Sequence, residues 1–342
     1  MIRVLVIDDS LFIRTVVQDM LADDPGIQVI GVASDGVEAL EKIRELKPDL
    51  ITLDIEMPKL NGIGVLEKKR EIPQFPRTLM LSSLTSEGAE MTKRAISLGA
   101  DDFMLKPRGI KNIREIGAEL RSKIKNICTI AYVTSKPVAR DELARNIVLI
   151  GSSAGGPPML DVVVSTLKAD LDAAVIITQH MPKGGFTAAL AARLDRISPL
   201  QIKETENGDI LKRGMIFISK AGFHTIVSSY LDKNGVQGGK IVHADSPPVH
   251  NVKPAVDKTF VSAAQVYGSR SVSAILSGMG NDGGEGSEAV KNAGGITIVC
   301  RQEDCLVYGM ARSALQRNAV DHVLPLKNIP AKIEELVRTL SG

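Results

Sequence analysis

The first apolar run of the chain, residues 4–10, reads VLVIDDS: four apolar residues, two adjacent carboxylates and a hydroxyl. A short apolar run that ends in polar residues is typical of a strand buried on both faces, as in a parallel sheet. In sheets of this kind, ligands bind at the carboxyl ends of the strands, which is where Asp8 and Asp9 fall. This stretch therefore predicts a parallel sheet with a polar site at one edge.

The pattern repeats along the first third of the chain, where short apolar runs alternate with segments that carry apolar residues at helical spacing. The predicted strands are 2–7, 27–33, 49–54, 77–82 and 102–105, and the predicted helices are 11–21, 37–46, 62–70, 90–99 and 111–125. Alternation of strands and helices predicts one doubly wound parallel sheet with right-handed crossovers, a flavodoxin-like α/β domain over residues 1–122.

The remainder of the chain predicts a linker and a second α/β domain. Residues 123–146 are polar and interrupted by Pro137, which is typical of a linker. Residues 147–342 return to strands alternating with helices, and residues 224–245 contain an Asn-Gly turn that predicts an antiparallel hairpin. The second domain is therefore expected to be a parallel-sheet α/β hydrolase domain with a hairpin insertion.

Composition limits the classes of function. The 342 residues carry a net charge of +2, so no broad basic field predicts a nucleic-acid partner. No apolar run reaches the roughly 20 residues of a membrane span, and the first residues lack the pattern of a signal peptide. Three cysteines are too few for a disulfide framework. A cytoplasmic protein without direct membrane insertion is expected.

The first candidate site collects polar residues from four predicted strand ends. Asp8 and Asp9 end the first strand, Asp54 the third, Ser82 the fourth, and Lys106 follows the fifth. Three carboxylates at one edge repel each other unless a cation joins them, and oxygen ligands suit Mg²⁺. A lysine beside such a cluster suits a site that holds a phosphoryl group.

Any one of these residues could instead cap a helix, as Ser10 and Asp35 are expected to do, but the whole set favours a site. The segments VLVIDDS, LDIEMPKLNG, MLSS and FMLKP resemble the receiver domain of two-component response regulators. This resemblance implies that Asp54 accepts a phosphoryl group and that Asp8, Asp9 and Asp54 bind Mg²⁺. It also implies phosphoryl contacts from Ser82 and Lys106, and a switch role for Phe103.

The second candidate site begins with residues 151–155, GSSAG, which fit the G-x-S-x-G turn that exposes a serine above an α/β sheet. The same glycines could approach a dinucleotide pyrophosphate, but that function requires an acid after the next strand, where His180 stands. The dinucleotide alternative is weakened and stays open. Ser153 is the candidate nucleophile.

His180 is the candidate base because it ends the strand next to the one that delivers Ser153. Asp282 follows the later strand 271–278 and completes the order Ser, His, Asp. A lone histidine is usually structural, which is the role expected of the other four: His224, His243, His250 and His322. Serine acyl transfer is therefore favoured over phosphate binding.

The segments IGSSAGGP, ITQHMP, NVKPAVD and ILSGMGNDG resemble the catalytic domain of the CheB methylesterase family. The resemblance implies a Ser153–His180–Asp282 triad without a cofactor, and an oxyanion held by the backbone N–H groups of Met279 and Ala154. The implied reaction is hydrolysis of glutamate methyl esters on methyl-accepting chemotaxis receptors, with deamidation of receptor glutamines as a second activity. The implied phosphodonor is the chemotaxis histidine kinase.

Two other classes of protein are alternatives to this interpretation of the sequence. A transcriptional response regulator requires a basic recognition helix, and the second half of the sequence has no helix-turn-helix signature. A binding module switched by phosphorylation does not require Ser153, His180 and Asp282 at three strand ends. Both alternatives predict no ester turnover.

Overall fold

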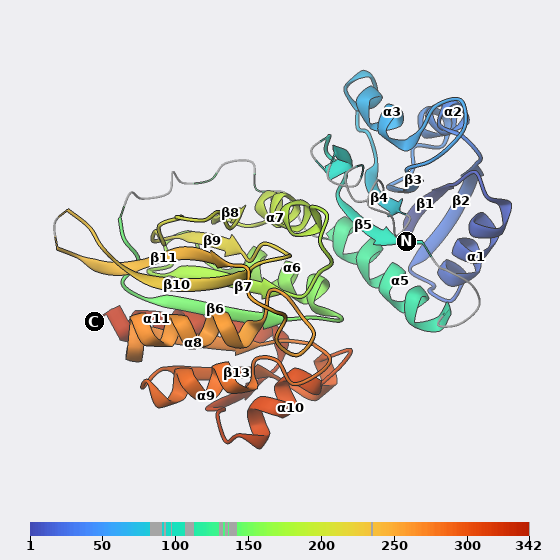
Figure 1. Ribbon diagram of the computed structural model, residues 1–342. Coiled ribbons are helices and arrows are strands. Elements are labelled where there is room, and N and C mark those ends of the chain that lie inside the picture. Colours follow the sequence, from blue (N-terminus) through green and yellow to red (C-terminus); the bar gives the residue numbers. More distant parts are fainter. Residues whose placement is uncertain are drawn as a thin grey trace. The chain divides into compact units, whose positions relative to one another are not determined.

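The computed structural model (Figure 1) describes residues 1–82, 91, 94–96, 98–106, 113–129, 133, 136, 142–233 and 235–341. Asn234 of the predicted hairpin turn lies outside these residues. So do parts of the predicted helix 90–99 and of the predicted linker 123–146. The chain divides into two compact units, one mainly of Met1–Ala131 and the other mainly of residues 132–342.

The first unit is built on a parallel sheet, as predicted. Its strands are β1 (Ile2–Ile7), β2 (Ile27–Ala33), β3 (Leu50–Asp54), β4 (Arg77–Ser82) and β5 (Asp102–Leu105). Their order across the sheet is β2-β1-β3-β4-β5, and every neighbouring pair is parallel. The order reverses at β1 and β3, so the carboxyl ends of these two strands flank the crevice where such folds bind ligands.

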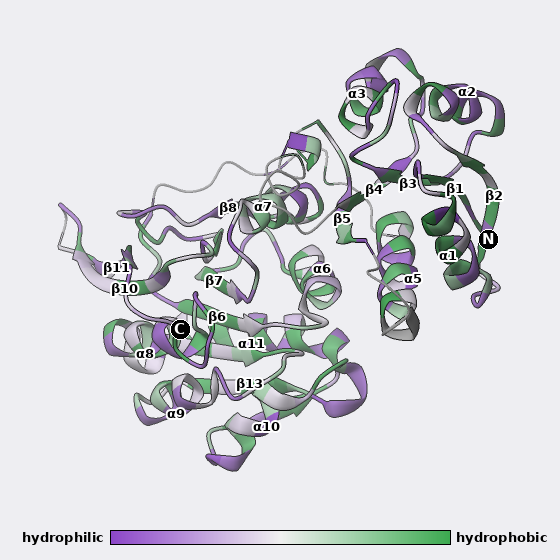
Figure 2. Cartoon of the chain, turned by 45° about the vertical axis from the view of Figure 1, so that its right-hand side comes forward, coloured by the Kyte–Doolittle hydropathy of each residue, from purple (hydrophilic) through white to green (hydrophobic). Residues whose placement is uncertain are grey.

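Helices cover both faces of this sheet. They are α1 (Leu11–Ala22), α2 (Gly36–Leu46), α3 (Gly62–Glu67) and α5 (Ile113–Thr129), with a short 3-10 helix, η1, over Lys68–Glu71. Val4 and Val6 of β1 pack in the core with α1 and α5, whereas Leu5 and Ile7 pack in the core with α2 and α3. Figure 2 shows the hydrophobic residues along β1 and β2 and the mixed hydropathy of the helices.

Side-chain caps fix where two of these helices begin. The Ser10 hydroxyl accepts a hydrogen bond from the Ile13 N–H, and the Asp35 carboxylate accepts from the N–H groups of Val37 and Glu38. The predicted capping roles of Ser10 and Asp35 are confirmed. At the other end of the unit, α5 continues to Thr129, so its last turns fall within the stretch predicted as linker.

The second unit contains a larger parallel sheet. Its strands are β6 (Ile147–Ser152), β7 (Ala174–Gln179), β8 (Gln201–Glu204), β9 (Met215–Ile218), β12 (Ser271–Ile275), β13 (Ile296–Cys300) and β14 (His322–Leu324). Their order is β14-β13-β12-β6-β7-β9-β8. The predicted hairpin is present as β10 (His224–Leu231) paired antiparallel with β11 (Gln237–Ala244).

The helices of this unit are α6 (Gly156–Thr166), α7 (Phe186–Ile197), α8 (Val256–Tyr267), α9 (Gly284–Asn292), α10 (Gly309–Gln316) and α11 (Ile329–Ser341). One core joins Ile147 and Leu149 of β6 to apolar residues of α8, α9, α10 and the hairpin. No helix within the described ranges is long and apolar enough to cross a membrane.

The strand order places three loops side by side. β6 lies between β12 and β7, and all three run parallel. The turn after β6, the residue after β7 and the loop after β12 therefore meet at one edge. This is the edge that carries Ser153, His180 and Asp282.

Candidate phosphoryl site and candidate active site

The acidic residues of the first unit lie together at the carboxyl edge of the sheet. One ligand oxygen from each of Asp8, Asp9 and Asp54 lies within 4.8 Å of the others. Lys106 Nζ lies 3.0 Å from Asp8 Oδ2 and 2.7 Å from Asp54 Oδ2. An all-oxygen donor set of this spacing fits a hard divalent cation such as Mg²⁺.

Burial makes the charge of this cluster costly. Asp8 and Asp54 are buried, whereas Asp9 is exposed. Burial raises the pKa of Asp54 to about 6, and the charge of Asp8 adds to the rise, although Lys106 opposes it. A bound cation would offset the same repulsion.

The other two predicted residues of this site, Ser82 and Phe103, lie on β4 and β5. Ser82 is the last residue of β4 and its backbone pairs with Leu105, but its side chain is outside what the structure describes. Phe103 is half-buried in β5, with Lys123 Nζ 5.9 Å from the centre of its ring. The sheet thus brings Ser82 and Lys106 to neighbouring strand ends.

In the second unit, Ser153 occupies the tight turn between β6 and α6. Gly155 adopts a left-handed conformation there, with φ of 77°, and a β-carbon on it would lie 2.7 Å from Leu306 Cβ. The Ser153 N–H donates to the Ser277 carbonyl at 2.9 Å. The turn is therefore held against the loop after β12, and the Ser153 side chain is left half-buried.

His180 follows β7 and forms a short hydrogen bond with Asp282. His180 Nε2 lies 2.7 Å from Asp282 Oδ2, and the Asp282 side chain is almost fully buried. Burial by itself would raise the pKa of Asp282, but hydrogen bonds from His180 and from backbone N–H groups outweigh it and hold that pKa below its usual value. Asp282 is therefore a carboxylate that can orient His180 and stabilise its charged form.

Gln179 links the serine turn to His180. Its Nε2 donates to the carbonyls of Ser153 at 2.9 Å and His180 at 3.0 Å, and its Oε1 accepts from the Ser152 hydroxyl at 2.6 Å. Sequence reasoning assigned no role to Gln179. The signal available was only its place as the last residue of β7, one before His180.

Two backbone N–H groups, those of Ala154 and Met279, belong to the two segments that meet at Ser153. Within the described part of the chain, the Ala154 and Met279 N–H groups make no backbone hydrogen bond. The Gly278 N–H donates to the Val307 carbonyl at 2.9 Å, and a β-carbon on Gly278 would lie 3.0 Å from Ser153 Cβ. The loop that carries Met279 is therefore fixed close to the serine, as an oxyanion site requires.

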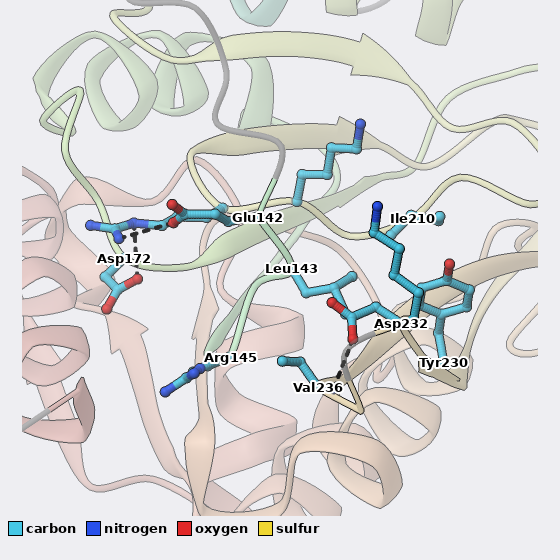
Figure 3. Close-up of a pocket in the computed structure, with 11 residues that line it drawn as sticks. Glu142, Leu143, Arg145, Asp172, Ile210, Tyr230, Asp232 and Val236 are labelled. Atoms are coloured by element: carbon cyan, nitrogen blue, oxygen red, sulfur yellow. Dashed lines mark hydrogen bonds and ion pairs between the residues drawn. The ribbon is translucent and has the colours of Figure 1, made fainter.

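A cavity of about 380 Å³ adjoins His180 and is lined by His180, Met181, Pro182, Lys183 and residues 251–253. A larger cavity of about 670 Å³ (Figure 3) is lined by Asp172 and Arg213, which precede β7 and β9. It therefore lies at the amino ends of the strands, away from the triad. There Arg213 pairs with Asp172 at 3.0 Å and Glu142 at 3.5 Å, so the charge of Arg213 is fully compensated by these two carboxylates.

Two histidines predicted to be structural have structural partners. His224 is buried and bonds to the Pro247 carbonyl and the Ala255 N–H, and His243 bonds to the Thr205 hydroxyl. His250 differs, because its Nε2 lies 2.9 Å from Asp257 Oδ2, beside Asp282. Sequence reasoning missed this pair, although Asp257 ends the segment NVKPAVD that carried the resemblance.

These features define a protein that combines a receiver-like acidic cluster with a serine-hydrolase-like site. The family model described as CheB methylesterase matches residues 148–333, and the one described as response regulator receiver domain matches residues 4–117. The first match covers more than half of the chain.

Named relatives resemble the chain over its whole length. Protein-glutamate methylesterase/protein-glutamine glutaminase 1 of Methanospirillum hungatei JF-1 is 78% identical over 342 residues, which is 100% of both chains. The corresponding enzyme of Thermotoga maritima is 42% identical and covers 98% of each chain. The crystal structure of the Thermotoga maritima CheB methylesterase catalytic domain is 41% identical with a TM-score of 0.53, and covers 56% of this chain and 98% of that one.

The chain therefore belongs to the CheB methylesterase family and carries a response regulator receiver domain. This confirms the predicted family, the predicted α/β fold of both domains and the predicted class of enzyme, a carboxylic ester hydrolase.

Proposed function

We propose that the protein hydrolyses glutamate methyl esters on methyl-accepting chemotaxis receptors, using Ser153 as the nucleophile, His180 as the base and Asp282 as its orienting carboxylate. The observation that carries this proposal is the 2.7 Å contact between His180 Nε2 and Asp282 Oδ2, at the edge where the turn of Ser153 also lies. The names of the relatives supply the glutamate ester and the glutamine amide as substrates.

The reaction follows from these positions. Ser153 Oγ attacks the ester carbonyl carbon while its proton passes to His180, and Asp282 stabilises the resulting imidazolium. The N–H groups of Ala154 and Met279 donate to the developing oxyanion, each contributing about 3 kcal/mol. Collapse of the intermediate returns the proton to the leaving methoxide, so methanol departs and a glutamyl-serine ester remains.

Hydrolysis of that ester completes the cycle. A water molecule gives a proton to His180 and attacks the acyl carbonyl, which releases the glutamate side chain and restores the Ser153 hydroxyl. The same site can act on a glutamine amide, in which case ammonia leaves in place of methanol. Ser153 Oγ has no hydrogen bond among the described residues, and the contact with His180 is expected to close when substrate binds.

We also propose that phosphorylation of Asp54 controls this activity and so contributes to chemotactic adaptation. The donor is the chemotaxis histidine kinase. Asp8, Asp9 and Asp54 would hold a Mg²⁺ ion, which would supply positive charge against the carboxylates and the phosphoryl group. Lys106, whose Nζ lies 2.7 Å from Asp54 Oδ2, is the proposed partner of that group. Ser82 is the second proposed phosphoryl contact. Phe103 is the proposed switch residue.

The free cysteines and the substrates suit the cytoplasm, where we propose that the enzyme acts. The test of the proposed reaction is release of methanol from methylated receptors by the full-length protein. Wild-type protein should release methanol, and Ser153→Ala protein should release almost none. Equal release by the two proteins would contradict the proposed nucleophile.

A further inference from the structure

A second carboxylate, Asp257, is built into the support of Asp282. Asp257 lies in the first turn of α8, and Asp282 lies just before α9. Asp282 accepts the N–H groups of Val256 at 2.7 Å and of Asp257 at 2.9 Å. In return, Asp257 Oδ1 accepts the N–H groups of Gly283 at 2.9 Å and Gly286 at 2.7 Å. Asp282 therefore caps the start of α8, which carries Asp257, and Asp257 caps the start of α9, which follows Asp282.

Both carboxylates are buried, with relative exposures of 3% for Asp257 and 1% for Asp282. Burial and the charge of Asp282 raise the pKa of Asp257, although the Gly286 N–H and His250 oppose the rise. Burying two carboxylates costs free energy unless hydrogen-bond donors or cations pair with them. His250 supplies one, because its Nε2 lies 2.9 Å from Asp257 Oδ2.

The ligand atoms of His250, Asp257 and Asp282 lie within 4.8 Å of one another, a spacing that also suits a metal ion. However, every oxygen of the two carboxylates already accepts a hydrogen bond: Asp257 from Gly283, Gly286 and His250, and Asp282 from Val256, Asp257 and His180. The group is therefore a completed hydrogen-bond network rather than a set of free ligands.

The network leads directly to the proposed catalytic base. Asp282 Oδ2 accepts from the Val256 N–H and also contacts His180. A shift of α9 or of the loop before it would rotate this carboxylate and misplace the His180 ring. The same loop carries the N–H of Met279, so the geometry of the proposed oxyanion site depends on it as well.

We propose that Asp257, held by His250, is a positioning residue for the esterase reaction. Its carboxylate fixes the Gly283–Gly286 backbone and thereby sets the orientation of Asp282 and of His180. This inference rests on the proposed Ser153–His180–Asp282 site and adds to it two residues that do not touch the substrate.

The test uses the full-length protein and methylated receptor. Asp257→Ala should lower kcat ten- to a hundred-fold with little change in KM, because substrate contacts remain while the base is misplaced. Asp257→Asn keeps an oxygen that can accept the Gly283 and Gly286 N–H groups, and should recover most of the lost kcat. His250→Asn should lower kcat less than Asp257→Ala does, because the Asp257 carboxylate keeps its bonds to Gly283 and Gly286. Asparagine is chosen because it tolerates the φ of 52° at this position.

A second measurement separates positioning from simple destabilisation. The proton between His180 and Asp282 should give a far-downfield ¹H NMR resonance, which Asp257→Ala should shift or broaden and Asp257→Asn should restore. The control is Asp321→Ala, which removes an exposed carboxylate that also accepts a backbone N–H, that of Thr297 at 2.8 Å in β13. This control should lower Tm without changing kcat or the resonance.

Two outcomes would overturn the inference: an Asp257→Ala protein with unchanged kcat and an unchanged resonance, or an Asp321→Ala protein with the same losses as Asp257→Ala. Neither outcome bears on the nucleophile. An active Ser153→Ala protein would instead overturn the proposed function, so the two failures are distinguishable.

Discussion

Adjacent serines in the turn after β6 have different environments, which predicts different effects of the same substitution. Ser152 is buried and donates to Gln179 Oε1 at 2.6 Å, whereas Ser153 is half-buried in the turn. Ser153→Ala should lower kcat/KM about 10⁴-fold with little loss of stability. Ser152→Ala should cost about 1–3 kcal/mol of unfolding free energy, because it leaves the Gln179 oxygen unsatisfied, and should keep most of the activity.

Methanol release and thermal unfolding of the two variants check this pair of expectations. His180→Ala should match Ser153→Ala, and the double variant should be hardly worse than either single variant, since the two residues act as a unit. Additive losses in the double variant would speak against a shared catalytic role.

At the receiver site, Asp54 and Asp9 should differ in how they affect phosphorylation. Asp54→Asn should abolish phosphoryl incorporation from a small phosphodonor, because an uncharged amide replaces the nucleophilic carboxylate. Asp9→Asn should raise the Mg²⁺ concentration needed, because one oxygen ligand is weakened. Asp35→Asn is the matched control, since Asp35 is a buried acid that caps α2 and should leave labelling unchanged. Phosphate found by mass spectrometry on another residue, or labelling that persists in EDTA, would contradict the assignment.

The positions of the candidate residues of both sites were predictable where each residue follows its own strand. Asp54 and His180 each stand at a strand end, and parallel strands gather their carboxyl ends at one edge. The Asp257–Asp282 contact could not be predicted in this way, because it joins the starts of two helices. No periodicity in the sequence specifies which helix starts meet.

At the scale of elements, the turn between β6 and α6 depends on glycine for two reasons, conformation and space. Gly155 has φ of 77°, and a β-carbon there would lie 2.7 Å from Leu306 Cβ, whereas Gly208 has φ of 93° and open space around it. Gly208→Ala should cost about 1 kcal/mol for the strained backbone alone. Gly155→Ala should cost more and should also lower kcat, because the serine turn must move.

Denaturant unfolding and esterase assays on both variants distinguish these effects. If Gly155→Ala and Gly208→Ala lost equal stability and had equal activity, Leu306 would have moved away from the new β-carbon without displacing Ser153.

The strands, the hairpin and the strand–helix alternation of both domains could be predicted from apolar periodicity and turn residues. The order β14-β13-β12-β6-β7-β9-β8 could not, because pairing between distant strands is decided by packing rather than by local pattern. The end of α5 at Thr129 was also missed, although Ile124 and Ile127 continue the helical spacing of Leu120 and pack with it in the core of the first unit.

At the scale of the whole molecule, the catalytic domain begins before its first strand. The Glu142 carbonyl accepts the Arg213 N–H at 3.0 Å, the Ala144 N–H donates to the Leu211 carbonyl at 2.9 Å, and Ala144 is fully buried in the core of this unit. A catalytic fragment should therefore start at residue 142, because a start at residue 147 would remove Ala144 from the core. The Thermotoga maritima catalytic domain, solved alone, supports the view that such a fragment folds.

This fragment tests how the receiver domain controls the esterase. We expect the unphosphorylated receiver to restrain the catalytic domain and phosphorylation of Asp54 to release it. A differential interaction of a few kcal/mol between the two states is enough for such a switch. Residues 142–342 should therefore have a higher kcat/KM on methylated receptor than the unphosphorylated full chain. Phosphorylation should raise the full chain to the level of the fragment or beyond.

The control for this comparison is the Asp54→Asn full chain treated with phosphodonor and Mg²⁺, which should stay at the low level. Thermal unfolding of the fragment must show a cooperative transition, so that a low activity is not caused by loss of fold. If the folded fragment and the unphosphorylated chain turned over receptor equally, restraint by the receiver would be wrong. Phosphorylation would then have to act by stimulating the esterase or by directing it to receptors.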